Sequence, residues 1–243
     1  MKDLKYYLKE SISDNTDETL KNSITKWIKS NTESIKEGRL DFDFNTNPPT
    51  VNYDGDIMFK SNITSLVSIF QWGEVEGHFD CSNCKSLTSL EGAPKIVKKD
   101  FWCAHCDSLT TLEGAPEKVG ENFHCADCKN LISLKGAPEK VGGIFACDKC
   151  PSLKTLEGAP EKIRGGFYCY YCLSLESLKG APKEVGGCFD CRDCTSLKTL
   201  EGAPKEVGDY FSCKNCTKLE SLKGAPKKIG GIFYCTGCGR KFL

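Results

Sequence analysis

A repeated pattern constrains the fold of this chain more than any other feature. It begins at Phe79 and reads F-x-C-x-x-C-x-x-L-x-x-L-x-G-A-P-x-x-V, with Ile in place of Val in two copies. A fixed period of about 20 to 50 residues is typical of solenoids, in which each copy is one coil that gains a core only by stacking on its neighbours. Every step is 22 residues, as the first cysteine of each copy shows: Cys81, Cys103, Cys125, Cys147, Cys169, Cys191, Cys213 and Cys235.

The start of each copy predicts a β-strand. In F-x-C, apolar residues alternate with a position that accepts any residue type, which is the period of a strand. L-x-x-L would then cross the bottom of the core, and G-A-P would bend the chain because Gly allows unusual dihedral angles and Pro fixes its own. Val97 and its equivalents would return to the core. We therefore expect parallel, in-register strands with an inward column of Phe beside an inward column of Cys.

This pattern resembles the leucine-rich-repeat family. The family signature, L-x-x-L-x-L-x-x-N/C-x-L, maps onto it with Phe and the first Cys as strand residues and the second Cys in the Asn/Cys position. The match covers Phe79 to the C-terminus, but Leu87 follows Cys84 by three positions rather than two. The resemblance is to short bacterial and bacteriophage repeats. It implies an α/β solenoid, a stack of parallel strands whose outer side is mostly not helical.

A degenerate coil precedes the first full copy. Residues 57–62 lie 22 positions before Phe79 to Cys84, which places Phe59 in the first Cys position and Asn62 in the second. Asn is the family's usual residue there, and its side chain satisfies the backbone of the turn. The resemblance therefore implies that the second Cys is a thiol in an Asn position. We expect about nine coils over residues 57–243.

Residues 1–56 are expected to form an N-terminal cap of two helices and a short strand pair. Helical periodicity covers residues 1–34, with a break at 13–16, and strand alternation covers 40–44 and 51–53. The opening, M-K-x-L-x-x-Y-L-x-E-S, is similar to short head-targeting tags on internal proteins of tailed bacteriophages, which would make this a phage internal or accessory protein. An ordinary amphipathic cap helix is the alternative. The two apolar stripes are Leu4, Leu8 and Ile12, then Leu20, Ile24, Trp27 and Ile28.

The composition limits the classes of partner and the cellular compartments that the chain is expected to have. Lys and Arg number 33, as do Asp and Glu, so the chain lacks the charge excess expected of a protein that binds nucleic acid or a membrane surface. No stretch reaches the ~18 apolar residues of a membrane span. The charged N-terminus does not resemble a secretory signal. We therefore expect a cytoplasmic protein whose 17 cysteines are thiols or metal ligands rather than disulfides.

The cysteine pairs allow two interpretations. Successive C-x-x-C pairs are separated by 18 residues, a spacing typical of zinc sites. However, the degenerate coil fills both Cys positions without sulfur, and buried Cys packs as a small hydrophobe. We favour structural thiols without a cofactor and keep zinc as the alternative. Cys188, outside both columns, is the best candidate for a reactive thiol, although we favour a tolerated surface substitution at this position. The alternative zinc ligands are Cys81, Cys84, Cys103, Cys106, Cys125 and Cys128.

Aromatic residues mark the predicted binding surface. From His78 onward, every Trp, Tyr and His falls in four outward columns that flank the Phe and the first Cys. The same columns hold six Asp against two Lys and one Arg, which disfavours a phosphate backbone as ligand. Tyr, Trp and Arg are frequent anchors of protein interfaces. The predicted binding residues on this concave face are Trp102, His105, His124, Tyr168, Tyr170, Tyr171, Asp190, Arg192, Tyr210 and Tyr234.

These observations predict a protein-binding repeat module rather than an enzyme. The three histidines lie on three different coils, and no catalytic constellation is apparent. The alternative is a zinc-stabilised structural repeat protein. The sequence leaves the identity of the partner and the oligomeric state open.

Overall fold

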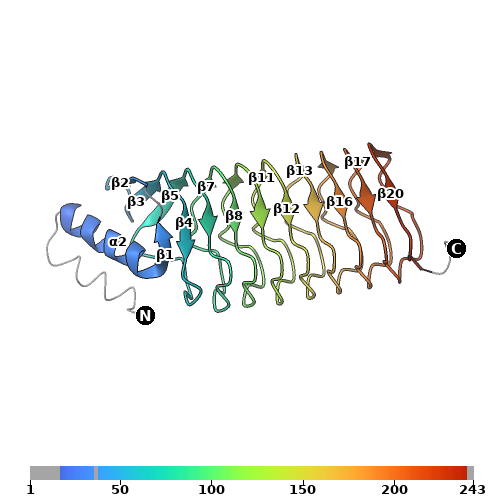
Figure 1. Ribbon diagram of the computed structural model, residues 1–243, viewed down its shortest axis with the longest axis horizontal. Helices are drawn as coiled ribbons and strands as arrows, with labels where there is room; N and C mark the ends of the chain where they lie inside the picture. Colours follow the sequence, from blue (N-terminus) through green and yellow to red (C-terminus); the bar gives the residue numbers. More distant parts are fainter. Residues whose placement is uncertain (1–16, 36–37, 240–243) are drawn as a thin grey trace.

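The computed structural model describes residues 17–35 and 38–239, which form an elongated stack of coils with one helix at its N-terminal end (Figure 1). Two sheets of ten strands each run along the stack. Each full coil up to the seventh contributes one short strand to each sheet, and the outer side of the coils is not helical. The predicted solenoid of parallel strands with a helical cap is thus confirmed.

The first sheet, sheet A, contains the predicted F-x strands. Neighbouring strands are parallel and in register, so that Phe123 pairs with Phe145. The strands β6 to β20 are only two residues long, because C-x-x-C already belongs to a turn. In order, sheet A consists of β1 (Thr32–Ile35), β4 (Ile57–Phe59), β6 (Phe79–Asp80), β8 (Phe101–Trp102), β10 (Phe123–His124), β12 (Phe145–Ala146), β14 (Phe167–Tyr168), β16 (Phe189–Asp190), β18 (Phe211–Ser212) and β20 (Phe233–Tyr234).

The second sheet, sheet B, forms where the sequence predicted only a return of Val to the core. The residue before each Val and the Val itself pair with the same residues of the next coil, as Lys118-Val119 does with Lys140-Val141. In chain order, sheet B consists of β2 (Leu40–Asp43), β3 (Thr50–Tyr53), β5 (Gln71–Val75), β7 (Ile96–Val97), β9 (Lys118–Val119), β11 (Lys140–Val141), β13 (Lys162–Ile163), β15 (Glu184–Val185), β17 (Glu206–Val207) and β19 (Lys228–Ile229).

The Phe column forms the centre of the core. From Phe79 to Phe211 these side chains have no exposed surface. Their rings stack on one another with centroid separations between 5.1 Å, for Phe123 and Phe145, and 5.5 Å, for Phe211 and Phe233. Parallel in-register strands bring identical residues side by side, so one aromatic at one position becomes a continuous stack.

The glycine of G-A-P is required for two reasons. Gly158 has φ of +101°, in the left-handed region that other residues rarely adopt. A Cβ at this position would lie 2.3 Å from the carbonyl oxygen of Leu134 in the preceding coil. The turn therefore excludes a side chain both by conformation and by its contact with the neighbouring coil.

The N-terminal end of the stack is covered by the helix α2 (Asp17–Asn31). Acidic residues occupy its first turn and Lys29 its last, as the helix dipole favours. Ile24, Trp27 and Ile28 are buried, which confirms the second predicted apolar stripe. The predicted strand pair is also present, as β2 and β3 pair antiparallel. The predicted first helix and the tag-like opening lie outside the described residues.

Two predictions in this region were wrong. The helix does not continue to residue 34. Thr32–Ile35 forms β1, which pairs antiparallel with β4, and the Thr32 hydroxyl donates to the carbonyl of Ile28 at the helix end. Asn62 does not fill the position of the second Cys, because the turn after Phe59 is displaced by one residue. Asn62 is exposed and Ile63 is buried in its place. Within the described part of the chain, no helix has the length and apolarity of a membrane span.

Candidate functional site

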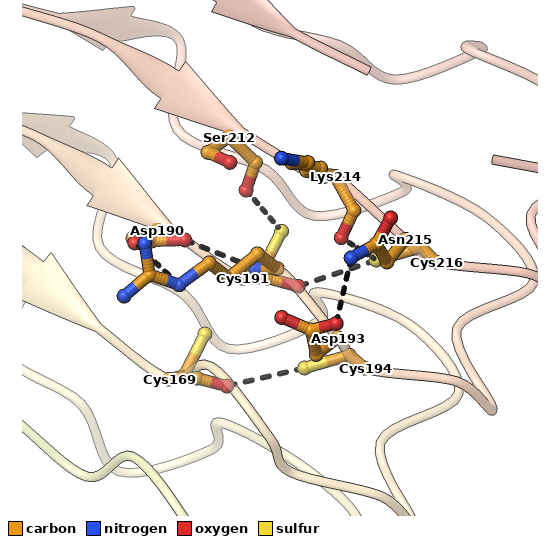
Figure 2. A network of polar contacts seen from close by, with 10 residues as sticks. Cys169, Asp190, Cys191, Asp193, Cys194, Ser212, Lys214, Asn215 and Cys216 are labelled. Carbon is orange, nitrogen blue, oxygen red and sulfur yellow. Dashed lines mark hydrogen bonds and ion pairs between the residues drawn. The ribbon is translucent and has the colours of Figure 1, made fainter. Parts of the chain in front are cut away.

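The cysteines form two columns inside the solenoid. Both are fully buried, the first from Cys81 to Cys213 and the second from Cys84 to Cys216. From the second full coil onward, each second-column thiol donates a hydrogen bond to the carbonyl of the first Cys one coil earlier, as Cys216 does to Cys191 with an Sγ–O distance of 3.2 Å (Figure 2). The equivalent donor–acceptor pairs are Cys106–Cys81, Cys128–Cys103, Cys150–Cys125, Cys172–Cys147, Cys194–Cys169 and Cys238–Cys213, at 3.0 to 3.4 Å.

These thiols are held in their neutral form. Burial raises the pKa of Cys103 well above its usual value, and that of Cys106 to about 12. The thiolate is the form that ligates metals and acts as a nucleophile. Among residues 17–35 and 38–239, no group of three or more Cys, His, Asp or Glu is placed to hold a metal ion. The six alternative zinc ligands lie in the two packed columns, where the geometry supports a structural role.

The turn between the two cysteines has an unusual backbone. The residue before the second Cys has φ between 55° and 61° in seven successive coils. Asn and Asp tolerate this left-handed conformation better than other side chains do. His105 and Tyr171 were predicted to lie on the sheet face, but both occupy this turn column and are exposed. The other five members are Asn83, Asp127, Lys149, Asp193 and Asn215.

Trp102 is the centre of an aromatic group on sheet A near its N-terminal end. His78, one coil earlier, stacks on it with a centroid separation of 4.9 Å, and His124, one coil later, lies at 6.3 Å. Burial lowers the pKa of His124, although Asp100 and Asp148 partly oppose this effect. His105, which was predicted to share this face with Trp102, instead belongs to the turn column.

A second group surrounds Tyr170. The guanidinium of Arg192 lies 4.8 Å from the centre of its ring, and Arg192 Nε is 3.5 Å from a carboxylate oxygen of Asp190. The Tyr170 hydroxyl is hydrogen-bonded to Asp148, which is 6% exposed, and Asp190 is 1% exposed. Burial raises the pKa of both carboxyl groups and, with the bond to Asp148, raises that of Tyr170 to about 12. The structure thus brings together three predicted residues, and adds Asp148.

Cys188 lies beside this group but does not have the properties of a reactive thiol. Its Sγ donates to a carboxylate oxygen of Asp209 at 3.2 Å, and it is hydrogen-bonded to Tyr168. Burial is the main effect that raises its pKa, followed by the bond to Asp209. Tyr210 is half-buried on the adjacent coil, and its ring contacts that of Tyr234 at 5.9 Å.

The residues that precede Phe form a hydrogen-bonded ladder in the first coils. The backbone N–H of Asn122 donates to Asp100 Oδ1, and that of Ile144 donates to Asn122 Oδ1, both at 2.8 Å. Earlier in the ladder, the N–H of His78 donates to Asp56 Oδ1 at 2.9 Å. The sequence analysis missed this role. The only signal was the succession of polar residues at this position before it changes to Ile144.

Two exposed apolar side chains lie in the turns that follow β14, at the edge of the Tyr170 group. Tyr171 is 47% exposed and Leu173 is 45% exposed. With Lys149 and Pro151 they line a shallow pocket of about 360 Å³. The Tyr171 ring meets that of Tyr170 edge-on, with a centroid separation of 6.0 Å. We call these four residues the Tyr171 patch.

No family model, no curated protein and no solved structure matches this chain. The leucine-rich-repeat resemblance therefore stays a prediction from the repeat pattern, and the site is interpreted from its geometry alone.

Proposed function

We propose that the chain is a protein-binding repeat module and that its binding site is centred on the Tyr171 patch and the neighbouring Tyr170 group. The observation that carries this proposal is the exposure of Tyr171 and Leu173, which are 47% and 45% exposed on either side of the buried Cys172. Tyr171 also has a left-handed backbone conformation that a Tyr does not favour. Strain and exposed apolar area concentrate at binding sites, where a partner's contacts offset their cost.

The chemistry of the surrounding face supports a protein partner. Aromatic and Arg side chains dominate the energetics of many protein interfaces, and Tyr170 with Arg192 supplies both types on one rigid support. The buried carboxylates Asp148 and Asp190 make the same region unfavourable for a phosphate backbone. The proposal therefore excludes nucleic acid as the ligand and assigns no catalytic role.

The proposed compartment is a reducing one, such as the cytoplasm. All described cysteines are free thiols, and the two columns use them as hydrogen-bond donors rather than as disulfides. Disulfides would form readily among so many thiols if the chain folded under oxidising conditions.

The experiment compares the double variant Tyr171→Ser, Leu173→Ser with the control Ile132→Ser. Ile132 is 45% exposed on another coil, so the control removes a similar exposed side chain outside the patch. A partner is first captured by the wild-type protein, identified by mass spectrometry and purified. Calorimetric titration should then show binding weakened by ~1–3 kcal/mol per lost anchor for the double variant, and unchanged for Ile132→Ser.

Folding is checked separately by urea denaturation, where both proteins should lie within about 0.5 kcal/mol of wild type. Tyr170→Ser is a poorer probe, because it would leave the Asp148 carboxylate, buried in the protein, without its hydrogen bond. If the double variant binds the partner as tightly as wild type, the Tyr171 patch is not the binding site.

A further inference from the structure

Two rows of charged side chains run along sheet B, on the side of the solenoid that the proposed function does not use. The first row holds the residue two positions before each Val or Ile, and the second row the residue one position before it. All twelve side chains are exposed. The first row is Glu117, Glu139, Glu161, Lys183, Lys205 and Lys227, and the second is Lys118, Lys140, Lys162, Glu184, Glu206 and Lys228.

Within each half of a row, neighbouring coils carry like charges, except that Glu206 lies opposite Lys228 and forms an ion pair with it at 3.1 Å. The register places Lys118 opposite Lys140 and Glu184 opposite Glu206. Like charges in directly opposed positions of a sheet are destabilising. Where the signs change between the fourth and fifth coils, Lys162 pairs with Glu184 at 2.9 Å and Lys183 pairs with Glu161. Among the described residues, Glu117, Lys118, Glu139, Lys140 and Lys205 take part in no ion pair, whereas the other charges of the rows at the sign change are paired.

The sign change makes the two rows self-complementary. Consider a two-fold axis parallel to the strands that passes between the fourth and fifth coils. A second copy placed face to face about this axis has its coils in the reverse order, so that Glu139 faces Lys205 and Lys140 faces Glu206 of the copy. Opposite charges meet at five of the six distinct facing positions, and the exception is Lys118 with Lys228 near the ends. Simple duplication of one coil would preserve Glu-Lys throughout, whereas both positions reverse together in the fifth and sixth coils and the first position is also reversed in the seventh.

The charged rows themselves line an open groove along sheet B. It has a volume of about 1120 Å³ and extends from Val119 to Gly230. Its lining is rich in small residues of the G-A-P and V-G segments, such as Ala137, Pro138 and Gly142. We infer that a second copy of this chain docks on sheet B in antiparallel orientation, with the charged rows that line the groove of each copy facing those of the other.

The test uses charge reversals that should complement each other in trans. Sedimentation velocity of the wild-type chain should show a dimer, and salt at about 0.5 M should weaken it at least tenfold because the contact is electrostatic. Glu139→Lys alone and Lys205→Glu alone should each weaken dimerisation at least tenfold. An equimolar mixture of the two variants should restore association, because the two substituted positions face each other between copies and then carry opposite charges.

The control is Glu220→Lys, which reverses an exposed charge on the L-x-x-L segment and should leave the dimer unchanged. Circular dichroism of each variant checks that the fold is retained. A wild-type chain that sediments as a monomer at low salt would overturn the inference. So would restoration of Glu139→Lys by Lys140→Glu instead of Lys205→Glu, since that result requires coils in parallel rather than reversed order.

Discussion

Two adjacent residues of each coil, the second Cys and the residue before it, differ completely in how they vary. The second Cys is the same in all eight coils, whereas its neighbour is Asn, His, Asp, Lys, Tyr or Gly. Both positions are structurally constrained. The thiol of the second Cys must reach a carbonyl of the preceding coil, and the residue before it must have positive φ. A contact with another coil therefore restricts its position to one type of side chain. A requirement on the residue's own backbone conformation, in contrast, is compatible with many side chains.

The largest effect is expected in the buried column that stacks between coils. Phe167→Ala removes a side chain with no exposed surface, between two stacked rings, and should cost ~3–5 kcal/mol of unfolding free energy. Phe233→Ala, at a half-buried ring of the last coil, should cost clearly less in the same urea denaturation experiment. Equal costs at the two positions would show that contacts between coils do not set the stability.

A smaller loss of stability is expected at a position that needs both a left-handed backbone conformation and close contact with the neighbouring coil. Gly158→Ala forces a side chain into the left-handed region and against the Leu134 carbonyl, and should cost roughly 2–3 kcal/mol. Gly231→Ala is the matched control, because its Cβ would first meet the flexible end of the Asp209 side chain. Thermal melts of the two variants measure the difference, and a Gly158→Ala protein as stable as the control would contradict the packing argument.

The thiol column should show a moderate effect. Cys150→Ala removes the bond from Sγ to the Cys125 carbonyl, at 3.4 Å, and leaves a buried acceptor unpaired, which costs ~1–3 kcal/mol. The same melts in a strong chelator separate this role from zinc binding. The chelator should leave the melting temperature unchanged, whereas a zinc-stabilised fold would unfold as its metal is removed. Stoichiometric zinc in the purified protein would contradict the structural interpretation.

The smallest effect, and the only increase in stability, is expected at the variable residue before the second Cys. Lys149 has φ of 55°, and Lys149→Asn should raise the unfolding free energy by roughly 0.5–1 kcal/mol, since Asn tolerates this conformation better. The lost ion pair with Asp127, 3.8 Å long and largely exposed, offsets little of this gain. The reverse change, Asn83→Lys, should lower stability by a similar amount in urea denaturation. No difference in either direction would show that the turn relaxes around any side chain.

The repeat predicted the fold because its constraints are local and periodic. The inward Phe and Cys columns and the G-A-P bend followed from residue types that recur every 22 positions. The length of the strands did not follow, because the alternation in F-x-C continues into a turn whose positive φ is compatible with residues as different as Asn83 and Lys149. Sheet B was missed for a related reason, since a single buried Val per strand is too short a signal to predict pairing.

The site was predicted less completely than the fold. The outward columns identified both Tyr170 and Arg192 as binding residues, and the structure places the guanidinium over the ring. Burial of Asp148 and Asp190 could not be predicted, because the columns contain six Asp and the sequence does not show which of them neighbouring side chains cover. The position of Tyr171 in a turn was missed because the alternation in F-x-C gives no sign of where the strand ends.

The buried thiols have a kinetic consequence. A cysteine alkylates only as thiolate, and burial raises the pKa of Cys150 to about 12, so a reagent modifies this side chain only after its coil has opened. Cys235 and Cys238 in the last coil are half-buried, whereas Cys125 and Cys128 are fully buried. The order in which the cysteines become alkylated under native conditions would thus report how opening spreads along the stack, coil by coil, without any engineered reporter residue.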